Sequence, residues 1–173
     1  MECILFRHGI AVDREDWDKD DSQRPLTRGG AEKTRQAAAG LLRLDVVPSH
    51  VLSSPFVRAL ETARIITELF RPAPDVQLCD ELLPGAHPEK LLAVLADLPA
   101  DGCVLCVGHE PHLGQTAGVM VFGKPVDGFS LKKAGACCLR FEDRPRPGSS
   151  ALRWWLTPAQ LRLLRKRMTS PGR

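Results

Sequence analysis

Residues 3–11, CILFRHGIA, decide the fold and raise the first question about function. The apolar run over residues 3–6 predicts a buried strand, because a strand covered on both faces has apolar residues at every position. This strand runs directly into Arg7, His8 and Gly9. Arginine and histidine are common in surface turns, so the tripeptide alone is weak evidence for a functional site. Whether it marks a site depends on what the rest of the chain places beside it.

Strand and helix patterns alternate through most of the chain. Further strands are expected at residues 50–54, 76–82 (a weaker pattern), 103–109, 135–141 and 152–156. Helices are expected over residues 24–44, 54–70, 88–98, a segment ending near Met120, and 157–168. Residues 13–21 are acidic and without period, which predicts a loop. The alternation predicts an α/β fold, a three-layer α/β/α sandwich around a mostly parallel sheet with right-handed crossovers.

Three chemically rich stretches follow three of these strands. They are Arg7-His8-Gly9, Ser53-Ser54-Pro55 with Arg58, and Gly108-His109-Glu110. Ligands of such folds bind outside the carboxyl ends of the strands, so the three stretches are expected to share one site. Ser54 is expected to cap the helix that Pro55 begins, and the first-turn amides of that helix favour an anion.

Two arginines, two histidines and a helix N-terminus suit a small dianion such as a phosphoryl group. A neutral His8, held by a backbone carbonyl near Gly9, is the candidate nucleophile, and a protonated His109 is expected to donate to the phosphoryl group. Arg7 and Arg58 would neutralise its charge. Glu81 or Glu110 could supply a proton to a leaving group, and this choice stays open. Acidic residues do not gather at these strand ends, which argues against a two-metal phosphatase, and no cofactor is expected.

Composition is that of one globular domain spanning residues 1–173. No apolar run is long enough to span a membrane, and the N-terminus has no secretory pattern, so a cytoplasmic protein with reduced cysteines is expected. Cys103 and Cys106 form a C-x-x-C, but their apolar setting favours core residues over a metal or redox site. The net charge is +3, with eight basic and no acidic residues over 144–173. A solvated helix face is favoured there over nucleic-acid binding.

These segments together resemble the histidine phosphatase superfamily, the phosphoglycerate-mutase-like proteins. The matching motifs are RHG at residues 7–9, SSPFVRALETA at 53–63, GH at 108–109 and LTRGGAEKTRQAA at 26–38. The short chain and the sequence RHGIA are most similar to SixA-type phosphohistidine phosphatases. The resemblance implies a phosphoglycerate-mutase-like fold in which His8 becomes phosphorylated. It implies that the phosphate is held by Arg7, Arg58 and His109, with Gly9 also expected in the substrate-binding set.

The function expected from this resemblance is hydrolysis of phosphohistidine on a phosphoprotein through a covalent phosphohistidine intermediate. One alternative is a phosphatase for phosphoprotein or small-molecule monoesters, which would need a working acid such as Glu81. Another is a module that binds phosphate or phosphopeptides without turnover. The expected partner is a phosphorylated protein or small molecule rather than nucleic acid or a membrane, and the oligomeric state stays open.

Overall fold

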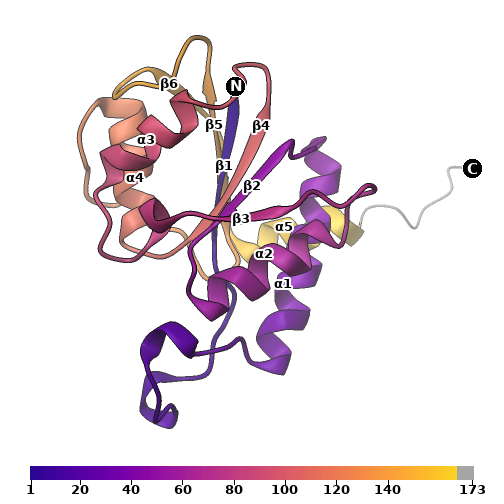
Figure 1. Ribbon diagram of the computed structural model, residues 1–173. Coiled ribbons are helices and arrows are strands. Elements are labelled where there is room, and N and C mark those ends of the chain that lie inside the picture. The colour runs from indigo at the N-terminus through magenta and orange to yellow at the C-terminus, as the bar shows by residue number, and fades with distance from the viewer. Residues whose placement is uncertain (167–173) are drawn as a thin grey trace, which may run out of the picture.

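Six strands form one mixed sheet in the computed structural model, which describes residues 1–166 (Figure 1). The strands are β1 (Glu2–Arg7), β2 (His50–Ser53), β3 (Val76–Leu78), β4 (Cys103–Gly108), β5 (Ala136–Phe141) and β6 (Ser150–Leu156). Their order across the sheet is β3-β2-β4-β1-β5-β6. The first four in this order are parallel, β5 pairs antiparallel with β1, and β6 pairs antiparallel with β5. The predicted mostly parallel sheet is therefore confirmed.

Helices cover both faces of this sheet, as predicted (Figure 1). They are α1 (Arg28–Leu41), α2 (Val57–Thr67), α3 (Pro88–Ala96), α4 (His112–Phe122) and α5 (Pro158–Lys166). Helices α1, α2 and α5 lie on one face, and α3 and α4 lie on the other. Alternate residues of β1 supply the two cores: Cys3 and Leu5 pack toward α3 and α4, whereas Ile4 and Phe6 pack toward α1, α2 and α5.

Helix α1 begins and packs for identifiable local reasons. The hydroxyl of Thr27 accepts a hydrogen bond from the N–H of Gly30 at 2.9 Å and so caps the helix. At the other end, Gly40 lies against α5, where a Cβ would come within 2.3 Å of the Leu161 carbonyl oxygen. The glycine therefore allows a close approach of the two helices that no larger residue permits without a backbone shift.

Several predicted boundaries differ from the structure. The strand expected at 76–82 is only β3, followed by a 3-10 turn at Asp80–Leu82, because this is an edge strand with few neighbours. The loop at 13–21 contains a 3-10 turn at Arg14–Asp16 and leads into another at Asp21–Gln23. Helix α2 starts at Val57, and Ser54 does not cap it. The predicted end of the last helix, at Met168, lies outside the described residues.

Five of the six cysteines are buried, as their apolar setting predicts, and Cys103 is half-buried and packs against the core. All six are free, and Cys3, Cys106 and Cys137 are fully buried in neighbouring strands. Burial raises the pKa of Cys103 to about 12, which keeps it a thiol rather than a thiolate at neutral pH. Over the described part of the chain, no helix has the length and apolar character needed to cross a membrane.

Candidate active site

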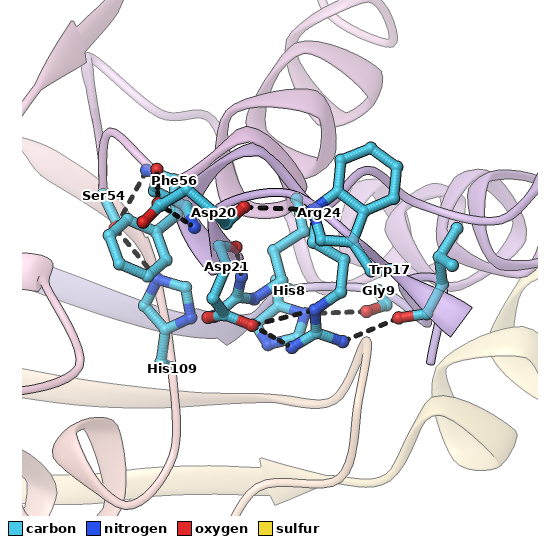
Figure 2. A network of polar contacts seen from close by, with 12 residues as sticks. His8, Gly9, Trp17, Asp20, Asp21, Arg24, Ser54, Phe56 and His109 are labelled. Carbon is cyan, nitrogen blue, oxygen red and sulfur yellow. Dashed lines mark hydrogen bonds and ion pairs between the residues drawn. The ribbon is translucent and has the colours of Figure 1, made fainter. Parts of the chain in front are cut away.

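The register of the parallel strands brings the predicted residues to one edge of the sheet. Arg7 at the end of β1 pairs with Gly108 at the end of β4, and Ser53 at the end of β2 pairs with Val107. The next residues are therefore His8, His109 and Ser54. The rings of His8 and His109 lie with their centroids 5.0 Å apart (Figure 2). Two histidines separated by about a hundred residues thus meet because adjacent parallel strands end at the same level.

His8 is held in one tautomer. Its Nδ1 lies 2.7 Å from the carbonyl oxygen of Gly9, which can only accept, so Nδ1 carries the proton. Its Nε2 makes no hydrogen bond to any described residue and keeps a lone pair. Burial lowers the pKa of His8 to about 3, with the charges of Arg58 and Arg7 adding to the effect and the Gly9 bond opposing it. At neutral pH His8 is therefore an uncharged imidazole with a nucleophilic nitrogen.

His109 is also uncharged, which differs from the protonated ring expected from the sequence. Burial, to which the charges of His8 and Arg58 add, lowers its pKa to about 2. The expectation neglected that the ring is only 2% exposed and stands among positive neighbours. Its Nε2 lies 2.9 Å from the hydroxyl of Ser54, and Phe56 packs edge-on at 5.2 Å. A bound dianion would reverse part of the shift, because opposite charge favours protonation.

The two arginines reach the same place from different elements. Arg7 donates from Nη1 to the carbonyl oxygen of Leu131 at 2.7 Å. Arg58, near the start of α2, is almost fully buried and binds Asp21. Both Nε atoms, and Nδ1 of His109, are buried without a hydrogen-bond partner among the described residues. An unsatisfied buried polar group costs about 1–3 kcal/mol, so three of them around one pair of histidines fit a site that an oxyanion completes.

The contacts of Gly9 give it a role other than the substrate binding that was expected from the sequence. Its N–H donates to the Thr62 hydroxyl at 3.0 Å, and its carbonyl accepts from His8, so its backbone is already occupied within the protein. A Cβ at this position would lie 2.1 Å from the Thr34 hydroxyl oxygen. These contacts do not support Gly9 as a substrate-binding residue. They indicate that glycine is needed there for packing and for orienting His8.

The two acid candidates occupy different settings. Glu110 accepts backbone hydrogen bonds from Leu131 at 2.8 Å and from Gly114 at 3.3 Å, so both of its oxygens are engaged. Burial raises its pKa, and those two donors and Arg7 oppose the rise. Glu81 instead lines an open pocket of about 580 Å³ with Asp21 and Phe56 in its wall. Glu81 therefore lies in the wall of an open pocket, whereas Glu110 is used to hold the backbone at Leu131 and Gly114.

Asp21 is the site residue that sequence reasoning missed. It comes from the acidic segment that was expected to be a loop of undetermined role, and its carboxylate lies 3.0 Å from Nη2 of Arg58 (Figure 2). Ser54 was expected only as a helix cap and instead contacts His109.

Nothing in the spacing of Asp21 along the sequence distinguishes it from the five other acidic residues between 13 and 20. Within residues 1–166, no group of three or more His, Cys, Asp or Glu side chains is arranged to hold a metal ion.

Comparisons with known proteins agree with this arrangement. A profile of the histidine phosphatase superfamily (branch 1) matches residues 3–83, which include Arg7, His8 and Arg58. An uncharacterised protein of Picosynechococcus sp. (strain PCC 7002) is 39% identical over 144 residues, covering 81% of this chain and 85% of that protein. Phosphohistidine phosphatase SixA of Escherichia coli (strain K12) is 26% identical over 166 residues, covering 94% and 98% of the two chains.

Among solved structures, protein histidine phosphatase SixA complexed with tungstate superposes with a TM-score of 0.80. It is 25% identical, and the match covers 93% of this chain and 99% of that one. Fold, motif order and the paired histidines lead to the same assignment: the chain belongs to the histidine phosphatase superfamily and has SixA among its relatives.

Proposed function

We propose that this protein is a metal-independent phosphohistidine phosphatase that works through a covalent phospho-His8 intermediate. The observation that carries the proposal is the free Nε2 of a neutral His8, which lies beside His109, the buried Arg58 and the half-buried Arg7. A relative with 26% identity is a phosphohistidine phosphatase, and a related structure holds tungstate, a tetrahedral oxyanion. The substrate is a phosphorylated histidine on a protein.

The reaction has two steps at one site. In the first, the Nε2 lone pair of His8 forms a bond to phosphorus while the bond to the leaving group breaks. The unpaired N–H groups of Arg7, Arg58 and His109 hold the phosphoryl oxygens as negative charge shifts toward the leaving atom. The Nδ1–H of His8 stays on the Gly9 carbonyl and stabilises the phosphorylated ring. In the second step water attacks phosphorus and releases phosphate, which restores neutral His8.

The site has few residues that can donate a proton to a leaving group, which favours phosphohistidine over a phosphate monoester as the substrate. Glu110 is engaged by two backbone N–H groups, and the two arginines beside Asp21 keep it ionised. A serine alkoxide is a poor leaving group without an acid, whereas a protonated phosphohistidine releases a neutral imidazole without further help. Glu81 is the remaining acid candidate, and its place on the pocket wall supports the alternative of a monoester phosphatase.

Trapping the intermediate tests the nucleophile. The protein is mixed briefly with a ³²P-labelled phosphohistidine donor and quenched in acid or in alkali. We expect label on protein that survives alkali and is lost in acid, as a phosphoramidate bond requires. His8→Ala should carry none, and His50→Ala, which removes a histidine away from the site, should label normally. Absence of label on the wild type, or label on His8→Ala, would refute the covalent step.

A substrate panel separates the two phosphatase functions. The wild type is compared on a phosphohistidine peptide, a phosphoserine peptide and an aryl phosphate. We expect the phosphohistidine peptide to have the highest kcat/KM. Glu81→Gln should leave this activity within about twofold. If Glu81 is a working acid, the same substitution lowers monoester turnover about 10²-fold or more. Faster hydrolysis of phosphoserine than of phosphohistidine by the wild type would favour the alternative.

A further inference from the structure

Arg58, the most buried cation of the site, already binds a carboxylate of its own chain. Its Nη1 donates to the backbone carbonyl of Asp21 at 2.8 Å, and its Nη2 donates to Oδ2 of the same residue at 3.0 Å. The Arg58 side chain is 5% exposed and that of Asp21 is 28% exposed. The arginine that should hold a phosphoryl group is therefore shared with an internal anion, and only its remaining N–H groups are free for a ligand.

Asp21 is held firmly in this position. Arg24 binds its other carboxylate oxygen through both Nε and Nη2, at 2.9 Å each. Arg24 also donates from Nη1 to the carbonyl of Val12 at 2.7 Å, which ties the segment to the chain just after β1. Although partial burial alone raises it, the pKa of Asp21 is lowered overall, since Arg58 and Arg24 lie beside the carboxylate. Asp21 is therefore a fixed negative charge.

This charge lies in the wall of a pocket that adjoins His109 through Phe56. Asp21 and Phe56 belong to the wall of the pocket that also contains Glu81. Phe56 in turn packs against both His109 and Arg58, with the guanidinium 4.9 Å from its ring centroid. Figure 2 draws Asp21, His8 and His109 in one network of polar contacts. A group attached to the phosphoryl moiety and occupying this pocket would therefore lie next to the Asp21 carboxylate.

From these contacts we infer that Asp21 determines specificity: it selects substrates that pair the phosphoryl group with an N–H donor or positive charge. This inference rests on the proposed function. Free phosphate and simple monoesters bring only negative charge, and they compete with the Asp21 carboxylate for Arg58. Phosphohistidine protonated on its second ring nitrogen brings an N–H, which the carboxylate accepts. When the P–N bond breaks, its electron pair stays on the departing nitrogen. The imidazole then leaves neutral, with that N–H still in place.

The test compares Asp21→Asn with the wild type and with Asp18→Asn. The asparagine keeps a carbonyl oxygen for Arg58 but removes the charge. Asp18→Asn removes the same charge from an exposed position of the same segment. Binding of inorganic phosphate is measured by calorimetry, and kcat/KM is measured on a phosphohistidine peptide and an aryl phosphate. Asp21→Ala provides a second variant, and circular dichroism checks that each variant is folded.

We expect Asp21→Asn to tighten phosphate binding at least about fivefold, the effect of one charge a few ångströms away in a partly solvated site. The ratio of phosphohistidine to aryl phosphate kcat/KM should fall about tenfold, and Asp18→Asn should change neither value more than about twofold. Unchanged or weaker phosphate binding in both folded Asp21 variants would overturn the inference, as would an unchanged ratio. Failure of the proposed function itself would give a different result, because the wild type would then not hydrolyse the phosphohistidine peptide.

Discussion

Acidification should destabilise this protein through its buried histidines. His8, His109 and His112 are each less than a tenth exposed, and burial lowers their pKa values to about 3, 2 and 4. In the unfolded chain the same rings titrate at the ordinary value of 6.5. Between these values the unfolded state binds protons that the folded state does not. The free energy of unfolding is therefore fully retained above pH 6.5 and decreases as the pH falls toward the folded-state values.

The size of the effect follows from the shifts. Each histidine that stays neutral in the folded protein lowers the free energy of unfolding by about 1.4 kcal/mol per pH unit. This loss begins below the pH at which the same ring becomes charged in the unfolded chain. Lowering the pH from 6.5 to about 5 should therefore lower the free energy of unfolding by about 1.5 kcal/mol per histidine, and by up to about 4.5 kcal/mol for the three. The raised pKa of Glu110 opposes part of this loss. Domains of this size have about 5–15 kcal/mol of stability, so the change is large.

Urea unfolding followed by circular dichroism at a series of pH values measures this dependence. His109→Gln should reduce the slope by about a third, because one of the three shifted groups is gone. The control His87→Gln removes an imidazole that is exposed already in the folded protein, and it should keep the wild-type slope. Saturating phosphate should also flatten the slope, since a bound dianion raises the pKa of the histidines beside it. A wild-type stability that stays constant between pH 6.5 and about 5 would refute the reasoning.

Substitutions at three further sites test particular contacts. His112→Leu should raise the free energy of unfolding by about 1 kcal/mol, because both ring nitrogens are buried without a partner among the described residues; a loss measured in urea would contradict this. Gly9→Ala should lower the free energy of unfolding by about 1–3 kcal/mol, because the new Cβ clashes with the Thr34 hydroxyl. Adding Thr34→Ala should restore part of that loss. Glu110→Ala should release the backbone at Leu131, whose carbonyl accepts a hydrogen bond from Arg7, and should raise KM about tenfold. Glu110→Gln should keep most of the affinity for substrate. Equal kinetics for the two variants would show that Glu110 does not hold this segment in place.

Most of the fold was predictable because it depends on local patterns. The apolar runs at the positions of β1 and β4 have no polar interruptions, and a strand buried on both faces requires this. Strand β3 was harder to predict, because an edge strand with exposed residues such as Leu78 carries little periodic signal. The start of α2 was misplaced because Ser54 and Pro55 form a good capping pattern, while in the structure the Ser54 hydroxyl lies beside His109.

The meeting of His8 and His109 could also be expected, since both directly follow strands of a parallel sheet. The place of Asp21 could not. It comes from a segment without periodicity, and its position is set by long-range ion pairs with Arg58 rather than by its neighbours in sequence. The charge of His109 was mispredicted for a related reason. A pKa depends on burial and on nearby charges from several elements, and spacing along one chain reports neither.

The sequence by itself determined the alternation of strands and helices and the identity of the two histidines and two arginines. It also determined that Arg7, His8 and His109 lie at strand ends. These properties are local, because side-chain periodicity and turn residues act over a few positions. Only the tertiary structure decided that Arg58 is shared with Asp21, that Glu110 tethers a loop, and that His109 as well as His8 is neutral in the free protein. Those properties arise from desolvation and from charges brought together across the fold, and they exist only once the chain has packed.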